Sequence, residues 1–197
     1  MSRKLVVLTF VSLDGVMQAP GGKGEDPSGG FDLEGWTVNY FDEGVGEEMT
    51  KQMGQPFDLL LGRKTYDVFA AYWPQQESPI NDAKKYVVTS RPIHTDWQGT
   101  VPIRGDIVAE IQQIKAQDGP MLQVHGSSQL IQTLLAHDLA DELWLKIFPV
   151  TLGKGKRLFG EGTIPAAFKL TGSAISASGV IVASYQRNGE LRLGSFT

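Results

Sequence analysis

The sequence predicts an α/β domain whose largely parallel sheet carries helices on its faces and ends in an antiparallel hairpin. Short, continuous apolar runs bounded by Gly, Pro or Ser are typical of strands that are buried on both faces. Amphipathic helical patterns lie between those runs, and this alternation favours parallel strands joined by crossover helices. Near the C-terminus, two further strand-like segments flank a small turn, which indicates a hairpin.

The elements follow from these patterns in chain order. Five apolar runs are expected to form the buried strands, over residues 5–11, 57–61, 86–89, 121–124 and 143–148. Helical periodicity predicts four helices, over residues 41–53, 64–72, 107–116 and 130–137. Gly44 and Gly46 weaken the first of these helices. The hairpin is expected over residues 168–176 and 180–187, with its turn at residues 177–179.

Two long segments have no regular pattern, residues 17–36 and residues 149–165, and both are rich in glycine. Long glycine-rich loops inside a compact domain are usually functional or mobile. No internal repeat and no linker divides the chain, so one domain is expected over residues 1–197.

Composition excludes several classes of function. The 18 Lys and Arg residues against 22 Asp and Glu residues give a net charge of -4, which argues against nucleic acid as a partner. The chain has no cysteine, which excludes a disulfide framework, thiol catalysis and cysteine-ligated metal, and no metal site is expected. No apolar stretch approaches the ~20 residues that span a membrane, so a soluble, cytoplasmic protein is expected.

A possible anion site lies where the second strand runs into its helix. Gly62 permits close approach of a ligand, Arg63 and Lys64 add positive charge, and Thr65 adds a hydroxyl at a helix N-terminus. The alternative is an ordinary helix start with two solvated cations. Taken alone, the pattern favours that alternative.

Two more candidate anion sites follow the next strands. Ser90 and Arg91 leave the third strand, where a hydroxyl and a guanidinium suit a phosphate ester. Gly126, Ser127 and Ser128 open the last helix and suit a pyrophosphate, or else one of the serines is a plain N-cap. His125 precedes them and is either a structural or an acid–base residue. Three such sites at three strand ends indicate one ligand with several phosphates, such as a dinucleotide.

Longer patterns carry a family resemblance. The chain contains Ser-Leu-Asp-Gly at 12–15, Leu-Gly-Arg-Lys-Thr-Tyr at 61–66, Thr-Ser-Arg at 89–91, and Val-His-Gly-Ser at 124–127. It continues with Leu-Ala-Asp-Glu-Leu-Trp-Leu at 139–145 and Pro-Val-Thr-Leu-Gly-Lys-Gly-Lys-Arg-Leu-Phe at 149–159. Over about the whole chain these motifs resemble the dihydrofolate reductase-like superfamily. More narrowly, they resemble the reductase domain of the bifunctional riboflavin-biosynthesis deaminase/reductase and its stand-alone relatives.

This resemblance implies a mixed eight-stranded sheet in a three-layer sandwich, and NADPH as the cofactor. The helix start at 62–65 would bind NADPH phosphates, Ser90 and Arg91 the adenosine 2'-phosphate, and the turn at 125–128 the pyrophosphate. Residues 13–18 match the loop over the nicotinamide, which assigns Leu13, Met17 and Gln18 to cofactor binding. The neighbouring glycine-rich segment would act as a lid that excludes water.

The resemblance also implies the reaction. Hydride would pass to a small pyrimidine- or pterin-like substrate, as in 5-amino-6-(5-phosphoribosylamino)uracil reductases. Asp42, Glu47 and Glu48 all fall near the acid expected on the first helix; Glu48 is the candidate, and the alternative is a solvated helix charge. Asp14 either orders the nicotinamide loop, donates a proton through water or only forms a turn. Trp36, Tyr40, Phe69 and Trp73 are either walls of the substrate site or core.

Two alternatives stay open, a non-catalytic nucleotide-binding module that retains the fold and a true dihydrofolate reductase. A homodimer is expected through residues 143–148 and the C-terminal hairpin, as is usual in the resembled group, and the alternative is that the same residues serve a monomeric core.

Overall fold

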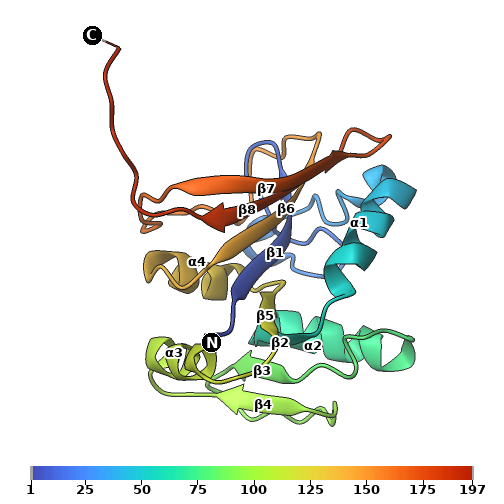
Figure 1. The fold of residues 1–197 in the computed structure, drawn as a ribbon. Coiled ribbons are helices and arrows are strands. Elements are labelled where there is room, and N and C mark those ends of the chain that lie inside the picture. Colours follow the sequence, from blue (N-terminus) through green and yellow to red (C-terminus); the bar gives the residue numbers. More distant parts are fainter. Residues whose placement is uncertain (1, 197) are drawn as a thin grey trace.

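One eight-stranded sheet organises the molecule, which is described by a computed structural model over residues 2–196. The strands lie in the order β4-β3-β2-β5-β1-β6-β8-β7. All pairs from β4 to β6 are parallel, and β8 runs antiparallel to both of its neighbours. Helices α1 and α2 cover one face and α3 and α4 the other, which gives three layers (Figure 1).

The strands and helices have the following bounds. The strands are β1 (Leu5–Ser12), β2 (Phe57–Gly62), β3 (Lys85–Val88), β4 (Thr100–Ile103), β5 (Met121–Val124), β6 (Glu142–Phe148), β7 (Phe168–Ile175) and β8 (Ile181–Arg187). The α-helices are α1 (Glu43–Met53), α2 (Arg63–Tyr72), α3 (Ile107–Ala116) and α4 (Ser128–Ala136). Three short 3-10 helices complete the list, η1 (Ser28–Gly30), η2 (Val38–Tyr40) and η3 (Trp73–Gln75).

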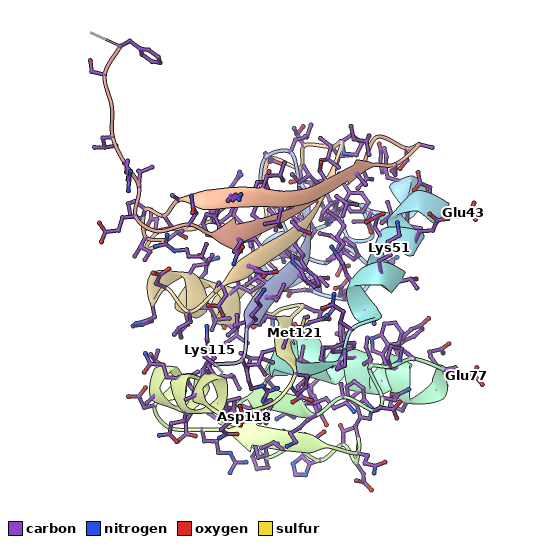
Figure 2. The ribbon with its side chains drawn as sticks, in the orientation of Figure 1. Glu43, Lys51, Glu77, Lys115, Asp118 and Met121 are labelled. Carbon is purple, nitrogen blue, oxygen red and sulfur yellow. The ribbon has the colours of Figure 1, made fainter. Side chains whose placement is uncertain are left out.

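The core lies on both faces of the sheet. The larger cluster joins β1, β5 and β6 to α3 and α4, and includes Leu122, Ile111 and Ile131, which are all fully buried. A second cluster joins β2 and β3 to α2. Figure 2 shows charged side chains such as Glu43 and Glu77 projecting outward from the helical layer. Burial of the apolar side chains against both faces is the main favourable contribution to folding.

The predicted fold class is confirmed, and the five buried strands, the four helices and the hairpin lie at or within a few residues of their expected positions. β4 was not among the strands expected from the apolar runs. It is an edge strand that contains Pro102, with Val101 and Pro102 exposed, so it lacks the apolar run that marks the others. No helix within residues 2–196 is long and apolar enough to cross a membrane.

The two glycine-rich loops fold against each other beside the end of β1. Val16 forms an isolated β-bridge with Arg157, and the Met17 amide donates to the Lys156 carbonyl over 2.8 Å. The Leu158 amide donates to the Gly15 carbonyl over 2.9 Å. Residues 17–28 and Lys156 are thereby held at the same edge of the sheet as the ends of β2, β3 and β5.

Candidate functional site

A large cleft lies at the carboxyl ends of the parallel strands. Its volume is about 1380 Å³, and its walls come from β1, from residues 17–28, and from the segments that follow β2, β3, β4 and β5. All four α-helices contribute further lining side chains. Carboxyl ends of strands in open α/β sheets are the usual place for ligands, because the connecting loops diverge there.

Two interlocked turns form the floor of this cleft. The Gly62 amide donates to the Gly126 carbonyl over 3.0 Å, so the turn before α2 touches the turn before α4. A Cβ added to Gly62 would stand 2.1 Å from Ser127 Oγ, and one added to Gly126 would stand 2.6 Å from Thr65 Oγ1. The Gly126–Ser127 peptide bond is cis. Both positions therefore require glycine for close approach.

The helices that begin at these turns differ from the others in how they are capped. The N-cap side chains of α1 and α3 are Asp42 and Asp106, and each accepts a hydrogen bond from the first helical turn. The N-cap residues of α2 and α4 are Gly62 and Ser127, and neither makes a side-chain cap. Two helix N-termini therefore meet in the cleft with backbone N–H donors and positive dipole ends available to an anion.

Cationic side chains line the outer end of the cleft. Arg63 is engaged, because its Nη1 donates to the Pro92 carbonyl over 2.7 Å and its Nε to Asp67 over 2.8 Å. Within residues 2–196, the guanidinium groups of Arg91 and Arg104 have no hydrogen-bond partner, and both residues are exposed. Ser90 lies beside them in the cleft wall. This end is suited to a phosphate ester.

Another part of the cleft lining is mainly apolar. Its lining side chains are Leu8, Phe10, Met49, Met53, Phe69, Trp73 and Ile80. The Phe69 ring contacts the His125 ring edge to face, with centroids 5.7 Å apart and planes at 60°. A chamber with aromatic walls and few polar groups is suited to a flat organic ring.

A buried polar network lies behind this chamber. His125 Nε2 contacts Gln123 Oε1 at 3.2 Å, Gln123 Nε2 donates to the Gln52 carbonyl at 3.2 Å, and Lys146 Nζ donates to Gln52 Oε1. Burial, with the nearby charge of Lys146, lowers the pKa of His125 to about 3, so the imidazole is neutral at pH 7. Burial also lowers the pKa of Lys146 to about 7, against the opposing effect of Glu48. His125 is therefore unsuited to acting as a general acid.

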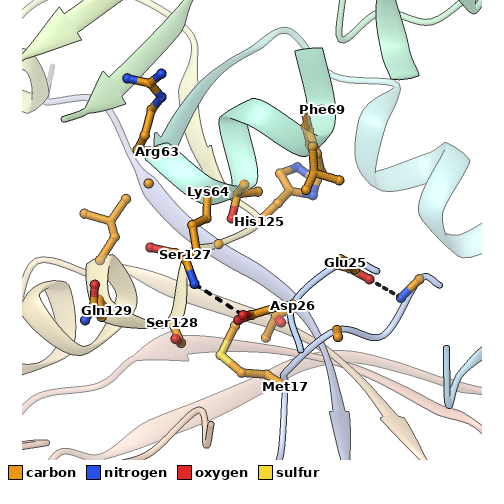
Figure 3. A pocket seen from close by; sticks show the side chains of 18 of the residues that line it. Met17, Glu25, Asp26, Arg63, Lys64, Phe69, His125, Ser127, Ser128 and Gln129 are labelled. Carbon is orange, nitrogen blue, oxygen red and sulfur yellow. Dashed lines mark hydrogen bonds and ion pairs between the residues drawn. The ribbon is translucent and has the colours of Figure 1, made fainter. Parts of the chain in front are cut away.

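The loop over the cleft carries two carboxylates of opposite character (Figure 3). Glu25 Oε2 accepts from the Gly21 amide over 2.6 Å, and burial raises the pKa of Glu25. Burial also acts to raise the pKa of Asp26, but hydrogen bonds from Lys156, Ser28 and Lys64 outweigh it and lower that pKa to about 2. Gln18 is buried and fastens the loop, since its Nε2 donates to the carbonyls of Asp26 and Ser28.

Most residues that the sequence analysis assigned to cofactor binding lie in this one cleft. They are Met17, Gln18, Gly62, Arg63, Lys64, Thr65, Ser90, Arg91, His125, Gly126, Ser127 and Ser128. Of the residues considered for substrate contact, Phe69 and Trp73 line the apolar chamber.

Five of the proposed residues lie outside the lining, and the first three are Leu13, Asp14 and Glu48. Leu13 is 61% exposed, and its amide is bonded to the Val150 carbonyl. Asp14 accepts hydrogen bonds from the Ser12 hydroxyl and from the Leu152 and Gly153 amides, and these lower its pKa to about 2. Asp14 thus joins β1 to the second loop. Glu48 pairs with Lys51 on the surface of α1, at 2.6 Å.

Trp36 and Tyr40 also lie away from the cleft lining. Trp36 Nε1 donates to the Gln18 carbonyl over 2.8 Å, and its ring packs on Phe148 with centroids 5.5 Å apart. Tyr40 packs against the cluster around Phe148, and its carbonyl accepts from Ser178 Oγ. Both aromatic residues therefore serve packing and support the loop from behind.

The cleft contains residues that the sequence analysis did not select. Arg104 follows β4, the strand that was not expected, and Asp26 and Lys156 come from the two irregular loops. Lys146 lies behind the cleft and is fully buried. A single lysine inside an otherwise apolar strand was a signal that could have identified it, because buried lysines are rare without a reason.

Known proteins are similar to this chain in sequence or in fold. The family model described as RibD C-terminal domain matches residues 3–182. The Bacillus subtilis (strain 168) protein YyaP is 28% identical over 196 residues, covering 95% of this chain and 96% of YyaP.

Solved structures with the same fold include a putative riboflavin biosynthesis protein from Shewanella sp. PV-4, with a TM-score of 0.68 and 23% identity over 95% of this chain and 99% of that one. A pyrimidine reductase-like protein from Corynebacterium diphtheriae has a TM-score of 0.65 at 12% identity, over 95% and 93% of the two chains. The dihydrofolate reductase of Enterococcus faecalis, complexed with NADP(H), has a TM-score of 0.62 at 16% identity, over 95% and 99%. At these identities the likeness concerns the fold.

Proposed function

The chain belongs to the RibD C-terminal domain family, and on that premise we propose that it is an NADPH-dependent reductase acting on a small heteroaromatic substrate. The family and the pyrimidine reductase-like structure support a reductase-type function.

One observation carries the cofactor proposal, the meeting of two uncapped helix N-termini in the cleft. The first turns of α2 and α4 present backbone N–H donors that suit a pyrophosphate. Arg91 and Arg104, at the outer end of the same cleft, suit a third phosphate such as the 2'-phosphate that distinguishes NADPH from NADH. The residues present therefore fit a dinucleotide with an additional phosphate.

The inner end of the cleft supports the substrate class. The aromatic side chains of Phe69 and Trp73, with Met49 and Met53 from α1, form a chamber for a flat ring. His125 brings the one imidazole in the lining, and it is held neutral. We propose a pyrimidine- or pterin-like ring for this chamber, with the 5-amino-6-(5-phosphoribosylamino)uracil reductase type of reaction as the first candidate.

This arrangement gives the cofactor and the protein different roles in the proposed reaction. NADPH, when bound, supplies the hydride. The helix N-termini and the outer arginines bind and orient its phosphates, and Gln18 holds residues 17–28 over the cleft. The chamber aligns the substrate ring and keeps water away from it. The contribution of the protein is therefore orientation and a dry pocket.

Energy transfer from tryptophan to bound nicotinamide tests the cofactor proposal, since Trp73 lines the cleft. We expect saturation at micromolar NADPH and weaker binding of NADH. A folded protein that shows no binding at micromolar NADPH would refute the proposal.

Turnover is then measured as loss of NADPH absorbance with the phosphoribosylamino-uracil and, separately, with dihydrofolate. Reduction of the first supports the proposed class, and reduction of dihydrofolate alone would identify a true dihydrofolate reductase. Binding of NADPH without reduction of either substrate would favour a non-catalytic nucleotide-binding module.

A further inference from the structure

On the wall of the cleft, the side-chain carboxylate of Asp26 lies between Lys64 and Lys156 and pairs with both. Asp26 Oδ1 lies 3.3 Å from Lys64 Nζ, and Asp26 Oδ2 accepts a hydrogen bond from Lys156 Nζ. Ser28 Oγ donates to Asp26 Oδ1 over 2.6 Å and accepts from Lys156 Nζ over 2.8 Å. Figure 3 shows Lys64 reaching from α2 across the opening to Asp26.

The two lysines come from separate parts of the chain and converge beside the helix N-termini. Lys64 lies in the first turn of α2, and Lys156 lies in the loop that follows β6. Both line the cleft, as does Asp26, and the Asp26 side chain is 18% exposed. Without the carboxylate, two ammonium groups would face each other there, and like charges at short range repel. In this structure the Asp26 carboxylate is the anion that pairs with both lysines.

The loop has anchors besides the Asp26 carboxylate. Gln18 Nε2 donates to the Asp26 carbonyl over 2.8 Å, and the Asp26 amide donates to Glu34 Oε1 over 2.8 Å. A second ion pair joins the same two loops, between Lys154 and Asp32 at 2.8 Å. That pair is well exposed, at 51% and 72% of the two side chains, and neither residue lines the cleft.

We propose that Lys64 and Lys156 bind a phosphate group of the ligand, and that Asp26 is the internal substitute for that phosphate in the ligand-free protein. The proposal rests on the proposed function in one respect, that a phosphorylated ligand enters this cleft. Asp26 is ionised at neutral pH and carries the same sign of charge as a phosphate. Binding then requires Asp26 to leave, and the apparent Kd equals the intrinsic Kd divided by the fraction of molecules in which Asp26 has left.

Matched variants test the proposal by calorimetric titration with NADPH and with pyrophosphate. Asp26→Asn removes the competing charge, so we expect affinity to rise about threefold to tenfold. Lys156→Met removes a charged donor, so we expect affinity to fall about tenfold. Asp32→Asn and Lys154→Met, in the exposed pair of the same loops, are expected to change affinity less than about twofold.

Two ligand sources are distinguished by a further titration with ribose 5-phosphate in the presence of saturating NADPH. A gain for NADPH in Asp26→Asn assigns the site to a cofactor phosphate, and a gain for ribose 5-phosphate alone assigns it to a substrate phosphate. No gain for either, or unchanged binding of all probes by Lys156→Met, overturns the proposal. If circular dichroism shows that Asp26→Asn does not fold, the affinities of Lys156→Met and Lys154→Met for the same probes are compared. A loss of affinity in Lys156→Met alone supports the lysine site, and equal affinities overturn it.

Failure of this proposal is distinguishable from failure of the proposed function. Pyrophosphate binding requires no hydride transfer and no nicotinamide. A protein that binds pyrophosphate with the expected dependence on Asp26 and Lys156 but never oxidises NADPH retains the lysine site and loses the reductase proposal. A protein that oxidises NADPH, but whose binding of every probe is unaffected by Asp26→Asn and Lys156→Met, supports the reductase proposal and refutes the lysine site.

Discussion

Replacement of Lys146 by methionine gives the most direct test of the buried network. The Lys146 side chain is completely buried on the α1 side of the sheet, with Gln52 Oε1 as its acceptor, and the charge of Glu48 acts to raise its pKa. Burial lowers its pKa from 10.5 to about 7. Methionine preserves most of the apolar stem of the side chain and removes the amine.

The sign of the effect follows from proton binding. Between pH 7 and pH 10.5, the unfolded chain keeps Lys146 protonated while the folded protein has largely lost that proton. The unfolded state therefore binds more protons, and the free energy of unfolding rises with pH across this window. At about 1.4 kcal/mol for each pKa unit, the full effect is about 5 kcal/mol, of which about 2 kcal/mol falls between pH 7 and pH 9.

Urea unfolding at pH 7 and pH 9, followed by tryptophan fluorescence, measures this difference. We expect the free energy of unfolding of the wild type to rise by about 2 kcal/mol relative to Lys146→Met over this interval. Lys169→Met, which removes an exposed lysine from β7, is the control and is expected to show no such difference. If the gap between wild type and Lys146→Met is the same at both pH values, the amine is not desolvated as described.

Three further predictions concern the cleft and its support. Arg91→Ala is expected to weaken NADPH about tenfold and NADH much less, by fluorescence titration, because NADPH alone has the 2'-phosphate; equal losses would remove Arg91 from that role. Gly126→Ala should lower both stability and NADPH affinity, since its Cβ meets Thr65 Oγ1 at 2.6 Å, and an unchanged melting temperature and Kd would contradict the close approach. Asp14→Asn should lower stability at pH 7, by less than the about 2 kcal/mol that the pKa shift alone corresponds to, because solvent screens this carboxylate. Because its pKa is depressed to about 2, that difference should disappear as pH falls from about 4 to 2 in acid unfolding, and a constant difference would argue against the ionised role.

The elements that the sequence predicted are those marked by local patterns. β1, β2 and β6 are apolar runs that are buried on both faces, so composition alone identifies them. β4 is an exposed edge strand with Pro102, and it acquires its strand geometry from pairing with β3. That pairing is a tertiary property which no short window of sequence contains.

In the candidate site too, residues marked by a local pattern were predicted and residues brought together by the fold were not. Gly62, Ser127 and their neighbours were identifiable because a glycine or serine between a strand and a helix is a local signal. The contact of Asp26 with Lys156 joins residues 130 positions apart, and no spacing rule predicts it. Trp36 illustrates the opposite error, because an aromatic residue in a functional loop has the same composition whether it faces a ligand or, as here, packs on Phe148.

The sheet is held together least strongly beside β5, near its centre, because β5 forms short pairings with both of its neighbours. β5 pairs through three residues with β2 and through three with β1, whereas β1 and β6 pair through seven and β6 and β8 through six. One half of the sheet, β2 to β4, carries α2, and the other half, with β1 and β6 to β8, carries α1 (Figure 1). A small rotation of one half against the other strains the fewest backbone hydrogen bonds beside this four-residue strand. The cleft lies at the end of β5, so such a rotation changes its width directly while the outer strand pairs stay intact.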